Sequence, residues 1–202
     1  MFADGRQEVK LPDGQVVKLS DLGDYPIWSA AALGSAQSAD VTLFNYSEGA
    51  TLPGVNNGTV RADKRHINVN YEGKMPDSDS MYIASVALEL DYDAPFTAIG
   101  QVLDSLYLSI KIAGDKELFQ AIGRHVPQGT GLGGFSNVNA QFSYSNGAPI
   151  LNNIRPLALP LFVGPNKTFR STLEMPGGAF TTASADFIVR EVWRGTRMRY
   201  TQ

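Results

Sequence analysis

Cysteine is absent from this 202-residue chain, and histidine is scarce, with only two residues. The lack of cysteine excludes disulfide bonds, thiolate metal sites and a cysteine nucleophile. A zinc site would therefore need His66 or His125 together with carboxylates from scattered loops. His66 also follows Lys64 and Arg65, a cationic setting that disfavours a metal ligand. We expect no metal and no cofactor, and we expect both histidines at the surface or at an interface.

The chain also has little net charge and no long apolar run. Its 17 basic and 20 acidic residues give a formal charge of -3, which argues against a surface built as a whole for nucleic acid. Residues 1–6 lack a basic segment followed by an apolar run, so we expect no signal peptide. No apolar stretch approaches the ~18 residues that a membrane-spanning helix needs. These features predict a protein made in the cytosol.

Glycine and proline, by contrast, are plentiful, with 20 and 11 residues spread along the chain. Even spacing of such residues is typical of many short strands. We find no internal repeat and no linker-like change in composition, and the length suits one all-β domain. The sequence therefore predicts a single domain over residues 1–202, with a short N-terminal arm and an arginine-rich C-terminal arm.

Alternation of apolar and polar residues predicts most of the strands. We expect a hairpin over residues 8–19 and strands over residues 41–46, 66–71, 81–90, 106–112, 140–144, 157–163, 168–173 and 187–193. We expect a glycine-rich loop over residues 127–134 and leave residues 116–122 unassigned. Helical spacing predicts a short helix over residues 94–105, and the alanine-rich residues 30–33 suggest one helical turn. Gly195 is expected to mark a bulge or turn.

The predicted strand over residues 81–90 shows the clearest pattern. Its even-numbered apolar residues are expected to share one face: Tyr82, Ala84, Val86, Leu88 and Leu90. Roughly eight to ten strands, one short helix and long polar loops together predict an all-β jelly-roll sandwich or barrel of about eight strands. An up-and-down barrel would have shorter turns, and an immunoglobulin-like sandwich usually fits into ~100 residues.

Motifs that would carry catalysis are weak. Residues 129–134 match G-x-G-x-x-G in letters, but neither flank supplies the strand or helix that a dinucleotide site requires, so we expect a loop. No G-x-S-x-G nucleophile motif is present. The carboxylate pairs Asp77 and Asp79, and Asp91 and Asp93, suit turns, with a divalent cation as the alternative. We therefore expect no enzymatic activity.

Four arginines gather near the C-terminus: Arg190, Arg194, Arg197 and Arg199, with Glu191 as the one acidic residue among them. Alternation places Arg190 and Arg194 on one face of the predicted strand. One interpretation is a solvated strand face whose charges pair across strands. The other is a basic patch that gives lipid headgroups or nucleic acid a modest, salt-dependent affinity. Both interpretations remain open at the level of sequence.

Aromatic residues are candidates for a second kind of site. Tyr25, Trp28, Phe44 and Tyr46 are close together in sequence and could line a sugar site. Residues of this type more often anchor a core or an interface.

The order of these turns and strands resembles the single jelly-roll capsid proteins of icosahedral bacteriophages, especially those with an internal membrane. The resemblance covers most of the chain. It is carried by Tyr25-Pro26-Ile27-Trp28, Leu43-Phe44-Asn45-Tyr46 with Gly49, Tyr71-Glu72-Gly73-Lys74-Met75-Pro76, Val126-Pro127-Gln128-Gly129-Thr130-Gly131, Asn146-Gly147-Ala148-Pro149, Ile154-Arg155-Pro156-Leu157, Thr168-Phe169-Arg170 and Gly195.

The resemblance implies a virion structural protein that is made in the host cytoplasm and assembles into an icosahedral shell. Its expected partners are copies of itself in trimers or pseudo-hexamers, other virion proteins, and an internal membrane or the packaged genome. The four C-terminal arginines would then face inward toward that membrane or genome. A carbohydrate-binding jelly-roll module, such as a lectin or a phage receptor-binding head, is the alternative function.

Overall fold

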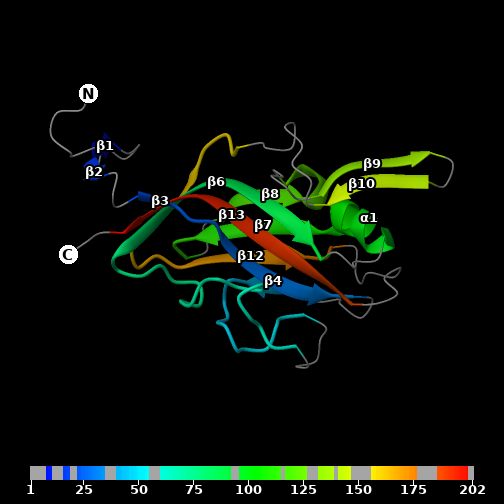
Figure 1. Cartoon of the computed structure of the whole chain (residues 1–202), viewed down its shortest axis with the longest axis horizontal. Coiled ribbons are helices and arrows are strands. Elements are labelled where there is room, and N and C mark those ends of the chain that lie inside the picture. Colours follow the sequence, from blue (N-terminus) through cyan, green and yellow to red (C-terminus); the bar gives the residue numbers. More distant parts are fainter. Residues whose placement is uncertain are drawn as a thin grey trace.

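The computed structural model describes residues 8–10, 16–18, 22–34, 40–54, 60–91, 96–114, 117–126, 132–138, 141–146, 156–176 and 186–199. The strands are β1 (Glu8–Lys10), β2 (Val16–Lys18), β3 (Leu22–Asp24), β4 (Ile27–Leu33), β5 (Val41–Leu43), β6 (Asp79–Leu90), β7 (Tyr107–Ile112), β8 (Glu117–Ile122), β9 (Leu132–Val138), β10 (Gln141–Asn146), β11 (Leu161–Val163), β12 (Phe169–Glu174) and β13 (Phe187–Arg199). Between β6 and β7 lies the helix α1 (Phe96–Ser105), and a 3₁₀ turn covers Gly123–His125. Figure 1 shows these elements along the chain.

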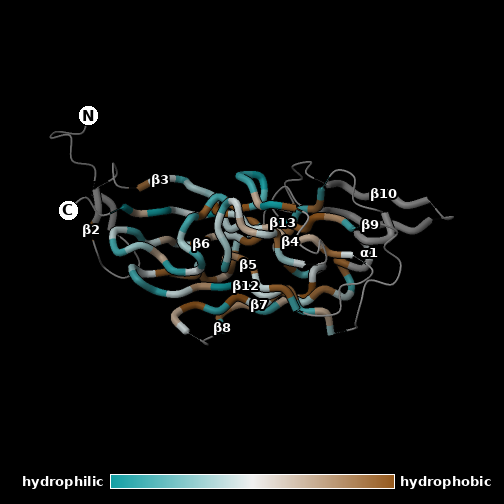
Figure 2. The backbone as a smooth tube through the Cα atoms, turned by 90° about the horizontal axis from the view of Figure 1, so that it is seen from below, coloured by the Kyte–Doolittle hydropathy of each residue, from teal (hydrophilic) through white to brown (hydrophobic). Residues whose placement is uncertain are grey.

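Two antiparallel sheets form the body of the molecule. One has the order β11-β6-β13, with β4 and β3 following one another along the far edge of β13, and the other has the order β5-β12-β7-β8. Figure 2 shows the two layers edge-on, with apolar segments along the strands of both. Eight strands follow the jelly-roll order: β4, β6, β11 and β13 lie in one sheet and β5, β7, β8 and β12 in the other, and the chain changes sheet at each step except from β7 to β8. The predicted all-β sandwich with one short helix is therefore confirmed.

The space between the sheets is filled by aliphatic and aromatic side chains. Trp193 of β13 packs on Phe44, with ring centroids 4.4 Å apart, and on Phe169 of β12, with centroids 5.5 Å apart. All three rings are buried. These contacts place β13 over β12, and β4 lies over the segment that follows β5, because the Ser29 hydroxyl accepts a hydrogen bond from the Phe44 amide at 3.0 Å. The edge strands β11 and β8 consequently lie on the same side of the sandwich.

A β-bulge divides the long pairing of β6 with β13. Arg194 pairs with Ser85 and Gly195 pairs with Ile83, so Ala84 is an extra residue in β6. The buried face of β6 therefore changes from odd to even numbers, and Ala84 is exposed. The prediction that Tyr82 and Ala84 share a face with Val86 is wrong for this reason, because an unpaired residue reverses the alternation. The predicted bulge at Gly195 is confirmed.

Residues 30–33 belong to strand β4, so the predicted helical turn is wrong. The run Ala30–Leu33 is buried on both faces, since one face meets the core and the other is covered by the connection from β5 to β6. Small side chains allow this close cover. The Ala32 amide donates to the Pro53 carbonyl at 2.9 Å, and a Cβ on Gly54 would lie 1.7 Å from the Ala32 carbonyl oxygen.

Residues 66–71 do not form the predicted strand. They contribute a single bridge, between Ile67 and Ser29, and the backbone turns at Tyr71. The apolar residues of this segment are buried because the segment packs across β4, so their alternation does not require a ladder of strand pairs. His66 is buried as well, and the expectation that it lies at the surface is wrong. His125 is exposed.

Other predicted elements correspond closely to the structure. The strands β1 and β2 pair as the expected hairpin, and α1, β7, β12 and β13 fall on predicted segments. β11 is an edge strand, as the proline before it indicated. β5 ends early because Phe44 takes a φ of 62°. The predicted loop over residues 127–134 is wrong in part, because residues 132–134 begin β9, while residues 127–131 lie outside the described residues.

Candidate functional site

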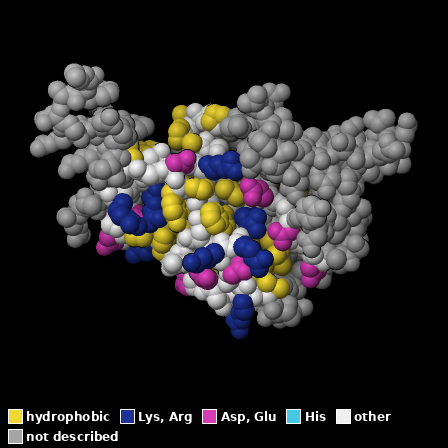
Figure 3. Space-filling model, in the orientation of Figure 1, with side chains coloured by type: hydrophobic (Ala, Val, Ile, Leu, Met, Phe, Trp, Pro, Cys, Tyr) yellow, Lys and Arg dark blue, Asp and Glu magenta, His cyan; other side chains and the backbone are white. Residues whose placement is uncertain are grey.

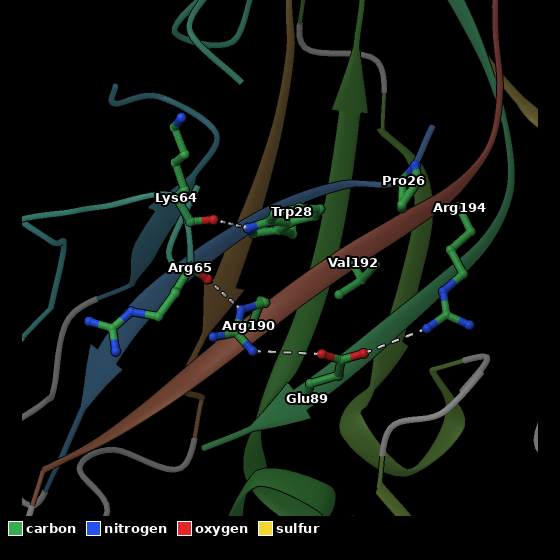
Figure 4. A pocket seen from close by; sticks show the side chains of 8 residues that line it. All are labelled: Pro26, Trp28, Lys64, Arg65, Glu89, Arg190, Val192 and Arg194. Atoms are coloured by element: carbon green, nitrogen blue, oxygen red, sulfur yellow. Dashed lines mark hydrogen bonds and ion pairs between the residues drawn. The ribbon is translucent and has the colours of Figure 1, made fainter. Parts of the chain in front are cut away.

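A groove of about 500 Å³ lies on the outer face of the sheet, where β4, β13 and β6 run side by side. Figure 3 shows apolar side chains on one face of the molecule with basic and acidic groups around them. The groove is lined by Pro26, Trp28, Lys64, Arg65, Glu89, Arg190, Val192 and Arg194 (Figure 4). It brings together four segments that are far apart in sequence.

Trp28 is held in place by the connection from β5 to β6. Its indole Nε1 donates to the Lys64 carbonyl at 3.0 Å. Its backbone amide donates to Oδ1 of Asn68 at 2.8 Å, and Nδ2 of Asn68 donates to the Pro26 carbonyl at 2.7 Å. The Asn68 amide thus takes the place of a neighbouring strand at the edge of β4. These bonds fix both the backbone and the ring of Trp28 at the groove.

Two of the predicted basic residues meet in this groove. Glu89 of β6 lies between them, with Oε2 at 3.7 Å from Nη1 of Arg190 and Oε1 at 3.7 Å from Nη2 of Arg194. Arg190 also lies 3.6 Å from the Asp91 carboxylate and donates from Nε to the Arg65 carbonyl at 2.8 Å. Arg190 and Arg194 therefore share the face that alternation predicted, and acidic residues of the neighbouring strand pair with them.

A tight turn supplies the remaining charges. Arg65 donates from Nη2 to Oδ2 of Asp63 at 2.8 Å. Hydrogen bonds from the Arg65 side chain and backbone hold the pKa of the Asp63 carboxyl well below its usual range. The Asp63 amide donates to Nδ1 of the buried His66 at 3.2 Å, which closes the turn from inside. This turn places Lys64 and Arg65 at the groove.

Arg197 and Arg199 lie on the opposite face of the same sheet. Both are paired with Asp79, the buried first residue of β6, and the guanidinium of Arg197 also lies 5.2 Å from the centre of the Tyr25 ring. Burial alone would raise the pKa of the Asp79 carboxyl, but the hydrogen bond and the positive charge of Arg197 lower it below its usual value. The four predicted arginines therefore form two pairs. Arg190 and Arg194 lie on the outer face of the sheet, and Arg197 and Arg199 lie on the opposite face.

The predicted aromatic group is divided in the same way. Phe44 and Tyr46 are buried in the core, where the Tyr46 hydroxyl donates to the Ala30 carbonyl at 2.6 Å. Tyr25 stacks with Arg197, and Trp28 alone lines the groove. Sequence reasoning did not connect Lys64 and Glu89 with Trp28, because only the long connection and the register of β6 with β13 bring them together.

A fully buried carboxylate lies within the core. Oε1 of Glu191 accepts a hydrogen bond from Nε1 of Trp193 at 2.5 Å, while Oε2 has no hydrogen-bond partner in the structure. Burial raises the pKa of Glu191 to about 7, and hydrogen bonds from Ser171 and Trp193 only partly offset that effect. The side chain is sealed between the sheets, so it faces no groove.

A second recess, of about 370 Å³, lies on the outer face of the other sheet. Its lining includes Thr42, Glu72, Lys111, Thr168 and Arg170. Three residues of its lining, Glu72, Gly73 and Gly114, have positive φ angles. In the part of the chain that the structure describes, no group of three or more His, Asp or Glu side chains is arranged to hold a metal ion. Nor is any helix there long and apolar enough to cross a membrane.

No family model matches the chain, and a search among curated proteins finds no significant match.

Proposed function

We propose that this chain is a virion structural protein, a capsid subunit that assembles with copies of itself into an icosahedral shell. The resemblance of its turns and strands to single jelly-roll capsid proteins supports this role, and so does the jelly-roll order of its eight main strands. A fold alone supports many functions. The proposal therefore depends on a surface suited to contact between copies.

That surface is the side of the sandwich formed by β8 and β11. Among the large apolar side chains described, seven are exposed, and four of these belong to β8, β11 or the residues just before β11: Leu118, Ile122, Leu159 and Phe162. Leu159 has 80% of its surface exposed. Leu118 and Ile122 point outward from one sheet and Phe162 from the other, because Phe119 and Ala121 pack on the core and Leu161 and Val163 are buried. Exposed apolar groups along a pair of edge strands are typical of an interaction surface. These groups along β8 and β11 are the observation that carries the proposal.

The contact would be made by side chains and not by adding a strand. β11 has three residues, and prolines flank it at Pro160 and Pro165. A proline lacks the amide that a strand ladder needs, and short edge strands of this kind discourage pairing between sheet edges. Neighbouring subunits would instead pack their apolar groups together, with contacts repeated by closed symmetry.

Sedimentation velocity over a range of concentrations tests the proposal. We expect trimers, hexamers or larger closed particles that dissociate on dilution. Leu159→Arg should lower the association constant about tenfold or more, because a charge would be buried at each contact. At dilutions where both proteins are single subunits, its melting temperature should equal that of the wild type, since Leu159 makes little contact within the subunit.

Thr172→Arg, on the outer face of β12, is the matched control and should associate as the wild type does. A wild-type chain that sediments as a monomer at every concentration would contradict the proposal. Equal association of the wild type and Leu159→Arg would show that the β8 and β11 side is not the contact.

In an assembled shell, the further partners would be other virion proteins and an internal membrane or the packaged genome. The protein would be made in the host cytoplasm and would function in the virion. The proposed inward-facing contacts remain Arg190, Arg194, Arg197 and Arg199. The first two lie on one face of the sheet and the last two on the other, so at most one pair meets a given surface.

A further inference from the structure

We infer that the groove at Trp28 is a saccharide-binding site. This inference goes beyond shell assembly and does not rest on it, because none of the exposed apolar side chains of β8 and β11 lines the groove. Its volume of about 500 Å³ falls in the range of small-ligand sites. The lining supplies the two things that a sugar ring requires, which are an apolar platform and fixed polar groups of both kinds.

The platform consists of Trp28, Pro26 and Val192. A sugar ring has an apolar face of C–H groups, which packs against an indole. The two hydrogen bonds that hold Trp28, from Nε1 to the Lys64 carbonyl and from its amide to Asn68, fix the ring before a ligand arrives. Because the ring is already fixed, binding would cost little conformational entropy. This raises the affinity that a ligand with few contacts can reach.

The polar groups stand beside this platform, as Figure 4 shows. Glu89 offers carboxylate oxygens as acceptors, and Arg190 and Arg194 on either side offer guanidinium donors. A sugar hydroxyl donates one hydrogen bond and accepts others, so neighbouring donors and acceptors can bind the same hydroxyl. Because the Arg190 side chain is anchored on the Arg65 carbonyl, the spacing of these groups is set by the fold.

The charges define the class of saccharide further. The four basic residues of the lining meet three carboxylates, those of Glu89 within the groove and of Asp63 and Asp91 beside it. This leaves one positive charge in excess, on a chain whose net charge is -3. An acidic saccharide should therefore bind more tightly than its neutral counterpart. A nucleic-acid strand fits less well, because a single positive charge in excess can offset one carboxylate but not a row of phosphates.

The two tryptophans make the site directly observable. Trp193 is fully buried between the sheets, and Trp28 lines the groove. In a ¹⁵N-labelled full-length chain, each gives one indole N–H resonance. We would titrate lactose, 3′-sialyllactose, cellotriose and chitotriose and follow both resonances. At least one saccharide should shift the Trp28 resonance in a saturable way and leave that of Trp193 in place, and 3′-sialyllactose should bind more tightly than lactose.

Variants separate this site from a general effect on the protein. Glu89→Gln and Arg194→Gln should each weaken the binding of a neutral saccharide about tenfold, because each removes charge-assisted hydrogen bonds. Arg170→Gln, which alters a cation on the outer face of the other sheet, is the control and should bind as the wild type does. Two groove variants are used, so that the test can still be made if one of them fails to fold.

Three results would overturn the inference. The first is no change of the Trp28 resonance with any of the four saccharides. The second is binding that Glu89→Gln and Arg194→Gln leave unaltered. The third is a shift caused by an oligothymidylate or by inorganic phosphate and by none of the saccharides, which would make the groove an anion site. The titration is run below the concentration at which shells form, so the failure of shell assembly would leave this result intact.

Discussion

Glu191 lies at the centre of the sandwich, and its two carboxylate oxygens have unequal surroundings. One accepts the Trp193 indole N–H and the other has no hydrogen-bond partner. A buried charge of this kind is unfavourable, so the core favours the protonated, uncharged form of Glu191 over the ionised form. The same residue therefore links the stability of the fold to pH near neutrality.

The stability of the wild type should fall as pH rises toward neutrality. The pKa of Glu191 is about 7 in the fold, against 4.5 for an ordinary glutamate, so the folded state holds a proton that the unfolded state releases between these values. The stabilisation is complete below about pH 4.5 and is lost as pH rises through 7, amounting to about 3 kcal/mol. Urea unfolding from pH 4.5 to 8 measures it.

Glu191→Gln is the matched variant for this measurement. It keeps the size of the side chain and cannot ionise, so its unfolding free energy should lack this decline, while slopes due to other groups remain. Asp79 acts in the opposite direction, because its pKa is lowered in the fold and its contribution is lost only at acidic pH. Parallel curves for the wild type and Glu191→Gln would show that Glu191 does not titrate as proposed.

Among the elements, the junction of β6 and β13 depends on one glycine. A Cβ on Gly195 would lie 1.8 Å from the Tyr82 carbonyl oxygen, so backbone would have to move in the centre of the sheet. We expect Gly195→Ala to lower the free energy of unfolding by about 2–3 kcal/mol. Gly23→Ala is the control, because a Cβ there would meet nothing within 4 Å. Equal melting temperatures for the two variants would contradict this role of Gly195.

The elements also show what sequence could and could not predict. Period-two alternation identified β7, β12 and most of β13 because one face of each strand is buried. It failed for residues 30–33, which are buried on both faces and so carry no alternation. It assigned the wrong face to Tyr82 because the bulge at Ala84 reverses the alternation within β6, and no turn or breaker residue in β6 marks it.

The groove could not be predicted from the alternation of residues, for a different reason. Arg190 and Arg194 were identified as sharing a face, but their neighbours come from β4, from β6 and from the turn at Lys64. Contacts between residues so far apart depend on register and on the docking of a long connection. No local pattern in the sequence carries that information.

For the whole molecule, the described sandwich joins a closed apolar core to an apolar side at β8 and β11. A subunit that acts alone gains nothing from the exposure of Leu159 and Phe162, whereas a shell subunit would cover them in every copy. Self-assembly therefore explains why these apolar side chains are exposed in the single subunit. The saccharide groove would remain accessible in the shell only if no neighbouring subunit covers that face of the sheet.

The most direct test of the shell proposal is electron microscopy of the purified full-length chain in negative stain, at high protein concentration. The account predicts closed particles of uniform diameter, or regular sheets of trimers or hexamers, which Leu159→Arg would abolish. Fields that contain only single subunits at every concentration and salt condition would contradict it.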